Sequence, residues 1–145
     1  MNKRLSRQAF SFLLILLLLA PAPGLAADYL VIVHPTNPRS SLTLEELGKI
    51  FLKRILKWDT EIAIVPVDQV RTARVRILFT RIVHRKPDSA LNSYWQQQIF
   101  SGRAVPPAEK ADDDEVLAFV SAEPGAIGYV TPGASIKGVK VLRIR

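Results

Sequence analysis

The chain lacks cysteine altogether and holds only two histidines, His34 and His84, in 145 residues. Without cysteine there is no disulfide framework, so the fold must depend on a single hydrophobic core. The two histidines are too few and too widely separated in the sequence to indicate a metal site. We therefore expect a small domain with no disulfide, no metal and no cofactor.

Catalytic signatures are missing as well. The sequence contains no GxSxG nucleophile elbow, no GxxxxGK phosphate loop and no GxGxxG dinucleotide motif. It also contains no internal repeat, linker or low-complexity tract. Because no nucleophile–base or metal constellation is present, we do not expect an enzyme.

Residues 1–26 have the pattern of a secretory signal peptide. An almost continuous apolar run, Phe10 to Leu19, follows a basic start, and Gly24 and Ala26 occupy the −3 and −1 positions of a cleavage site. The run is shorter than the roughly 20 apolar residues of a membrane-spanning helix, so cleavage is favoured over anchoring. We expect residues 27–145 to form one exported domain, periplasmic or secreted, with no membrane span after cleavage.

A strand–turn–helix unit opens the exported part. Leu30 to Val33 are consecutively apolar, which is typical of a strand covered on both faces. Thr43 and Glu46 have the spacing of a capping box, which predicts a helix over residues 44–52. The turn between them contains Ser40 and Ser41, and a turn of this kind next to a helix start can bind an anion.

The rest of the sequence alternates strands with helices. We predict further strands over residues 62–67, 126–130 and 139–144, and a helix over residues 72–84. Asp88 is expected to N-cap a third helix that ends at Gly102, and Asp112–Asp114 to start a fourth by complementing the helix dipole rather than to bind a cation. This order predicts an α/β three-layer sandwich with a mainly parallel, mixed sheet.

Basic residues are concentrated on and after the second helix. The net charge of +7 is partly that of the signal segment, but this later cluster belongs to the exported part: Arg71, Arg74, Arg76, Arg81, Arg85 and Lys86. Arg71, Arg74, Arg81 and Arg85 have helical spacing, which allows either an oxyanion-binding stripe or a solvated helix face. For an exported protein we favour the solvated face. We expect no nucleic-acid binding, because no fold or aromatic signature accompanies the charge.

Three segments together resemble a known family. They are HPTNPRSSLTLEELGKIF (residues 34–51), YWQQQIFSGRAVPP (94–107) and SAEPGAIGYV (121–130). In this order and spacing they resemble the substrate-binding proteins of phosphate ABC transporters, and most of all the short, single-domain relatives in that family. The resemblance implies one lobe of a type II periplasmic binding protein and a role in capturing phosphate or another solute.

The segment 68–76 differs from the family pattern. Family members carry Arg-x-x-Gly-Ser-Gly-Thr at the start of the helix after the second strand, where hydroxyl and backbone N–H groups hold phosphate. Here Ala73 stands at the Ser position, Arg74 at the following Gly and Val75 at the Thr, while Thr72 keeps a hydroxyl nearby. If the protein binds an oxyanion, we expect the site at the start of this helix and in the Ser-rich turn, formed by these residues: Ser40, Ser41, Arg71, Thr72 and Arg74.

Two hypotheses remain open at this stage. In the first, the protein binds phosphate or a similar oxyanion. In the second, it is a periplasmic interaction or scaffold module that keeps the fold, has lost the ligand, and acts beside an envelope protein. A binding protein of this type closes two lobes over its ligand, and this chain is long enough for about one. Strong ligand binding would therefore require a partner chain or a homodimer.

Overall fold

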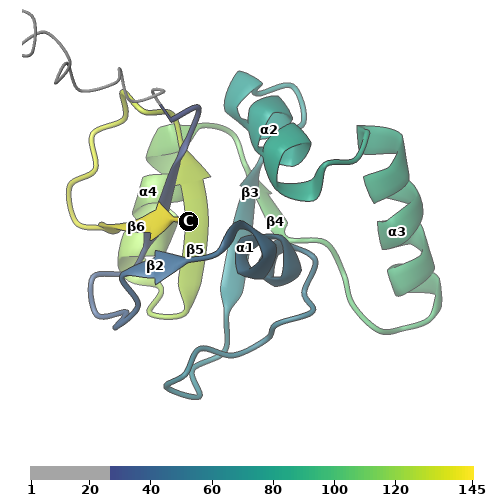
Figure 1. Cartoon of the computed structure of the whole chain (residues 1–145), viewed down its shortest axis with the longest axis horizontal. Coiled ribbons are helices and arrows are strands. Elements are labelled where there is room, and N and C mark those ends of the chain that lie inside the picture. Colours follow the sequence, from purple (N-terminus) through teal and green to yellow (C-terminus); the bar gives the residue numbers. More distant parts are fainter. Residues whose placement is uncertain (1–26) are drawn as a thin grey trace, which may run out of the picture.

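The computed structural model describes residues 27–145, which form one α/β unit (Figure 1). The predicted signal segment, residues 1–26, lies outside the described residues. A six-stranded sheet has the order β2-β6-β1-β5-β3-β4. The strands are β1 (Leu30–Val33), β2 (Ser41–Leu42), β3 (Val65–Gln69), β4 (Ala108–Lys110), β5 (Ala126–Val130) and β6 (Lys140–Ile144).

The sheet is mixed and mainly parallel. β1 pairs antiparallel with β5 and with β6, whereas β2–β6, β3–β4 and β3–β5 are parallel pairs. β1 therefore runs opposite to all the other strands, and the carboxyl ends of β4, β3 and β5 meet at one edge. Ligands in open α/β sheets bind outside the carboxyl ends of strands, so this edge is where a site is sought first.

Helices cover both faces of the sheet, as the sequence predicts. The helical elements are α1 (Leu44–Phe51), α2 (Arg74–Phe79), the π-helical turn η1 (Thr80–His84), α3 (Asp88–Phe100) and α4 (Asp113–Ala122). Successive residues of β1 alternate between the two layers: Val31 joins the core with α1, α2 and η1, and Ile32 joins the core with α4. The α/β three-layer prediction is confirmed.

The two cores differ in the side chains that fill them. On the α1 and α2 side, Phe79 stacks on Tyr129 with ring centroids 3.8 Å apart, and Phe51 packs against both rings. On the α4 side the helix lies close to β5 at Gly128, where a Cβ would lie 2.7 Å from the Val116 side chain. Glycine at this position lets α4 approach the sheet, and a larger residue would push the helix away.

The start of α1 agrees with its predicted cap. The Thr43 hydroxyl accepts a hydrogen bond from the Glu46 backbone, and the Glu46 carboxylate accepts one from the Thr43 N–H at 2.7 Å. Arg39 then donates to the same carboxylate at 2.8 Å. The turn between β1 and β2 is thereby tied to α1. This holds Ser40 and Ser41 at β2, the outermost strand on one side of the sheet.

Helix α3 stands apart from the layers (Figure 1). Leu91 is its only buried residue, and Phe100 at its end is 91% exposed. The Tyr94 hydroxyl donates to the Leu52 carbonyl at 2.8 Å and joins the helix to the end of α1. None of the helices in residues 27–145 combines the length and the hydropathy needed to cross a membrane.

Several local predictions need correction. The strand predicted over 62–67 lies at Val65–Gln69, and the short strands β2 and β4 were not expected. The helix predicted over 72–84 begins at Arg74 and becomes π-helical at Thr80. Asp88 is the first residue of α3 rather than its N-cap, because Pro87 occupies the cap position. Gly102 follows α3 with φ 66°, in agreement with its predicted role as a helix stop.

Candidate functional site

A polar network centred on the carboxylate of Asp113 joins the carboxyl ends of β3 and β5. Asp113, the first residue of α4, accepts hydrogen bonds from the Thr131 N–H at 3.1 Å, from the Thr131 hydroxyl at 2.5 Å and from Gln69 Nε2 at 2.7 Å. Three donors thus converge on one carboxylate, which is an arrangement that could otherwise hold a bound oxyanion. The position outside these strand ends is therefore already occupied.

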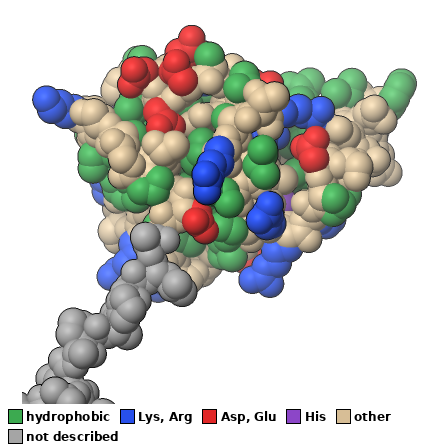
Figure 2. Space-filling model, turned by 90° about the horizontal axis from the view of Figure 1, so that it is seen from above, with side chains coloured by type: hydrophobic (Ala, Val, Ile, Leu, Met, Phe, Trp, Pro, Cys, Tyr) green, Lys and Arg blue, Asp and Glu red, His purple; other side chains and the backbone are tan. Residues whose placement is uncertain are grey.

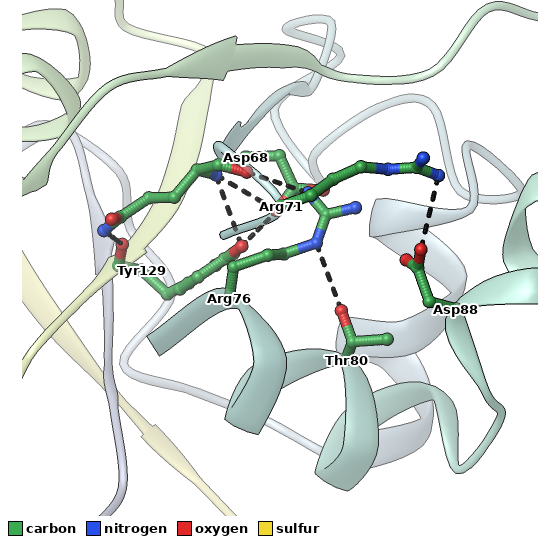
Figure 3. Close-up of polar contacts among 7 residues, drawn as sticks. Asp68, Arg71, Arg76, Thr80, Asp88 and Tyr129 are labelled. Atoms are coloured by element: carbon green, nitrogen blue, oxygen red, sulfur yellow. Dashed lines mark hydrogen bonds and ion pairs between the residues drawn. The ribbon is translucent and has the colours of Figure 1, made fainter. Parts of the chain in front are cut away.

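A second acid is buried beside this network (Figure 3). Asp68 of β3 pairs with Arg76 of α2, with an Oδ2–Nη1 distance of 2.5 Å, and accepts a hydrogen bond from the Tyr129 hydroxyl. Arg76 also donates to the Gln69 carbonyl and to the Thr80 hydroxyl, each at 3.1 Å. Burial raises the pKa of Asp68, and the Arg76 guanidinium opposes that shift. The guanidinium of Arg76 is therefore paired with groups inside the protein.

A solvent-open groove lies on the other side of Arg76, between α2, η1 and the start of α3. Its volume is about 530 Å³, and it is lined by Arg71, Arg76, Ile77, Thr80, Arg81, Arg85, Lys86, Pro87 and Asp88. Figure 2 looks down on the top of the molecule as drawn in Figure 1 and shows basic and hydrophobic side chains side by side on that face. We call this feature the basic groove.

The charges of the basic groove are only partly balanced. Arg71 reaches across to Asp88, with an Nη2–Oδ2 distance of 3.6 Å, and both side chains are about half exposed (Figure 3). Arg81, Arg85 and Lys86 form no salt bridge with any acid of residues 27–145. The groove therefore offers three unpaired cations beside a weak ion pair, and it favours an anion.

The backbone that forms one wall of the groove has an unusual conformation. η1 is π-helical, and Arg85 after it has φ 51°, in the left-handed region. A left-handed non-glycine residue costs about 1–2 kcal/mol. π-helical turns and strained residues are frequent at functional sites, and they persist only where the surrounding structure holds the backbone in that conformation. Here they turn the chain so that Arg85 and Lys86 line the groove.

The five residues predicted as an oxyanion site are separated in the structure. Ser40 and Ser41 lie at the β2 edge, and three strands, β6, β1 and β5, separate them from β3. Arg71 lines the basic groove, whereas Thr72 and Arg74 are exposed and do not line it. Ala73 precedes α2 without any side-chain cap, and the helix has only six residues. The structure thus brings only Arg71 to the groove.

Sequence reasoning named the groove cations but assigned them to a solvated stripe. Three of the four arginines of the predicted stripe, Arg71, Arg81 and Arg85, line the groove, whereas Arg74 does not. The network at the strand ends was missed, since the strand was predicted to end at residue 67, before Asp68, and Asp113 was assigned only its role at the start of a helix, which the structure confirms. A strand extended through Asp68 and Gln69 would have located the network.

The histidines do not contribute a metal site. His34 accepts from the Thr36 N–H at 3.2 Å and is 2.7 Å from the Thr36 hydroxyl, so it stabilises the turn after β1. His84 lies beside a second cavity of about 290 Å³ between α1, η1 and α3. Within residues 27–145, no group of three or more His, Cys, Asp or Glu side chains is placed to hold a metal ion. Trp58 is buried in the core.

Comparisons with known proteins agree with this architecture. The sequence profile of a family described as a PBP superfamily domain matches residues 24–141. No curated protein matches the chain. Similar solved structures include a protein from Clostridium perfringens that is assigned as a phosphate ABC transporter substrate-binding protein and holds bound phosphate. Its TM-score is 0.65 and its identity 21%, over 81% of this chain and 44% of the other.

Two further solved structures show the same relation. An ABC-type phosphate transport receptor from Vibrio cholerae has TM-score 0.65 and 18% identity, over 81% of this chain and 46% of the other. PstS from Borrelia burgdorferi has TM-score 0.63 and 19% identity, over 81% and 47%. At these identities the likeness is one of fold, and the chain spans less than half the length of each of these proteins.

Proposed function

We propose that this chain, which belongs to the family described as a PBP superfamily domain, binds phosphate or a related oxyanion in the basic groove and is not an enzyme. The observation that carries the proposal is the set of unpaired cations there, Arg81, Arg85 and Lys86, beside the Arg71–Asp88 pair. One of the solved structures of this fold holds bound phosphate, which supports the same class of ligand.

The roles of the groove residues follow from their chemistry. Arginine presents planar N–H donors that match the oxygens of phosphate, whereas lysine acts as a point charge. Arg81 and Arg85 would donate to the ligand, and Lys86 would add charge. Arg71, which the sequence also nominated, would leave Asp88 and turn to the ligand. Ser40, Ser41, Thr72 and Arg74 have no part in this site.

Export is part of the same proposal. The basic and apolar pattern of residues 1–26 supports secretion into the periplasm or beyond, with residues 27–145 as the functional domain. Periplasmic binding proteins close two lobes over a ligand, and this chain spans less than half the length of the similar structures. We therefore propose that a second copy or an envelope protein supplies the missing cover over the groove.

Calorimetry with inorganic phosphate at low salt tests the proposal. We expect binding by the unaltered protein and, for Arg81→Ala, a loss of about 10-fold to 100-fold in affinity, as for one charge-assisted hydrogen bond. Arg74→Ala is the matched control, because Arg74 is an exposed arginine of the adjoining helix that does not line the groove. Equal losses in the two variants, or no binding of phosphate at all, would reject the basic groove as the site.

A second candidate function rests on different residues. Asp113 occupies the donors at the strand ends, and α3 ends in the exposed Phe100. Both features suit an interaction module that keeps the fold without a solute and docks through α3. Sedimentation would show a homodimer of the protein that Phe100→Ser dissociates. A protein that is monomeric at every concentration, and is unchanged by the substitution, would exclude docking of two copies through α3.

A further inference from the structure

The basic groove has more room and more apolar surface than an inorganic oxyanion can use. Its volume of about 530 Å³ lies within the roughly 300–1,000 Å³ of sites that take small organic molecules. Inorganic phosphate is all charge and oxygen, so it would contact the cations and leave the rest of the groove hydrated. The surplus space is the first indication of a larger ligand.

The apolar part of the groove has a defined position. Ile77, on the second turn of α2, is 48% exposed, although it lies one residue from the buried Arg76. Pro87 lines the same groove between the cations of η1 and the start of α3. An exposed isoleucine beside arginines gains free energy only when something apolar covers it, because its present contact is with water. The lining of the groove thus combines charged and apolar side chains.

The cations line the same groove as this apolar surface. The side chains of Arg71 and Asp88 meet there at 3.6 Å (Figure 3). Arg81, Arg85 and Lys86 come from η1 and the residues that follow it. Guanidinium groups also stack on planar organic groups. A ligand that carries both an oxyanion and an organic group can therefore use the whole lining.

We infer that the natural ligand of the basic groove is an organic phosphate, a phosphomonoester whose phosphate binds Arg81 and Arg85 and whose organic group covers Ile77 and Pro87. This inference rests on the proposed function, because it assigns a ligand class to the same groove. Either a free metabolite or the phosphomonoester headgroup of a lipid presents this chemistry. A phosphomonoester should bind with higher affinity than inorganic phosphate, and this difference in affinity can be measured.

Calorimetry with three probes tests the inference: inorganic phosphate, phenyl phosphate and phenol. We expect phenyl phosphate to bind about tenfold more tightly than inorganic phosphate, as for an apolar contact that covers roughly half of an isoleucine side chain. Phenol should not bind detectably, because the cations then have no partner. Inorganic phosphate bound as tightly as phenyl phosphate would overturn the inference and leave the proposed function intact. Binding of neither anion would overturn both.

Two variants locate the organic group. Ile77→Ala should remove most of the preference for phenyl phosphate and leave the affinity for inorganic phosphate unchanged. Ile99→Ala is the matched control, since Ile99 on α3 is 51% exposed and does not line the groove. Ile77→Ser provides the same test with a polar side chain. If neither Ile77 variant alters the preference, the organic group does not lie on Ile77 and the inference fails.

A vesicle experiment separates the two sources of the ligand. Phosphatidic acid carries a phosphomonoester, so vesicles of phosphatidic acid in phosphatidylcholine should retain the protein if the source is a lipid headgroup. Retention that phenyl phosphate competes away and that Arg81→Ala abolishes would assign the headgroup. Binding of phenyl phosphate without retention would assign a soluble ester.

Discussion

Protonation of His84 should make the protein less stable in mild acid. Burial, together with the nearby charges of Arg76 and Lys86, lowers the pKa of His84 from 6.5 to about 4. The ring packs edge-on to Phe79, with centroids 6.0 Å apart, and its Nδ1 is buried without a hydrogen-bond partner. A proton added at Nδ1 would therefore have no hydrogen-bond acceptor among the described residues.

The sign and size of the effect follow from these values. A lowered folded-state pKa means that the unfolded chain binds the proton more readily, so His84 contributes stability that is complete above about pH 6.5 and is lost as the pH falls toward 4. Between pH 7 and pH 5 the loss in the free energy of unfolding is about 2 kcal/mol. For a domain of this size this is a measurable part of the total.

Urea denaturation at pH 7 and pH 5 measures the effect. The unaltered protein should lose about 2 kcal/mol more between these values than His84→Gln, whose side chain does not titrate. His34→Gln is the control, because His34 is hydrogen-bonded in an exposed turn. If His84→Gln keeps the same pH dependence as the unaltered protein, the acid sensitivity comes from other groups and the reasoning about His84 is refuted.

Three further predictions concern the groove and its support. Asp88→Asn should raise phosphate affinity by about threefold to tenfold in calorimetry, because Arg71 is then released to the ligand; unchanged affinity would separate Arg71 from the site. Arg85→Gly should raise the melting temperature by relieving roughly 1 kcal/mol of left-handed strain and should weaken phosphate binding; a lower melting temperature would contradict the strain. Arg76→Met should destabilise by about 3–5 kcal/mol in urea, and addition of Asp68→Asn should restore most of it; a double variant no more stable than Arg76→Met would argue against the pair.

The sequence located elements whose signal is carried by their own residues. Ala126–Val130 was predicted with its observed bounds, because a run of apolar residues follows a Pro-Gly stop and is buried on both faces. The Thr43 capping box likewise defines the start of α1 from two residues three apart. The strands β2 and β4 have no such signal. Each has only two or three residues and exists because β6 or β3 offers a pairing edge.

The site was harder to predict for a related reason. Arg76 looks like its exposed neighbours in sequence, and only the tertiary partner Asp68 makes its burial favourable. The groove depends on the π-helical turn and on the left-handed Arg85, neither of which has a simple residue pattern. Arg71 could be nominated because it follows a strand at a recognisable position. The groove around Arg71 is formed by tertiary structure, because α2, η1 and the start of α3 all contribute to its lining.

The occupied strand ends determine where a ligand can bind. Asp113 accepts three hydrogen bonds outside β3 and β5, and a second anion there would meet that carboxylate at close range without a free donor. The cations that remain unpaired lie across Arg76, in a groove open to water. Because water weakens each charge interaction in an open site, a single copy of this chain should hold its ligand weakly. Affinity should rise when a second chain covers the groove, since the same contacts are then made in a drier environment.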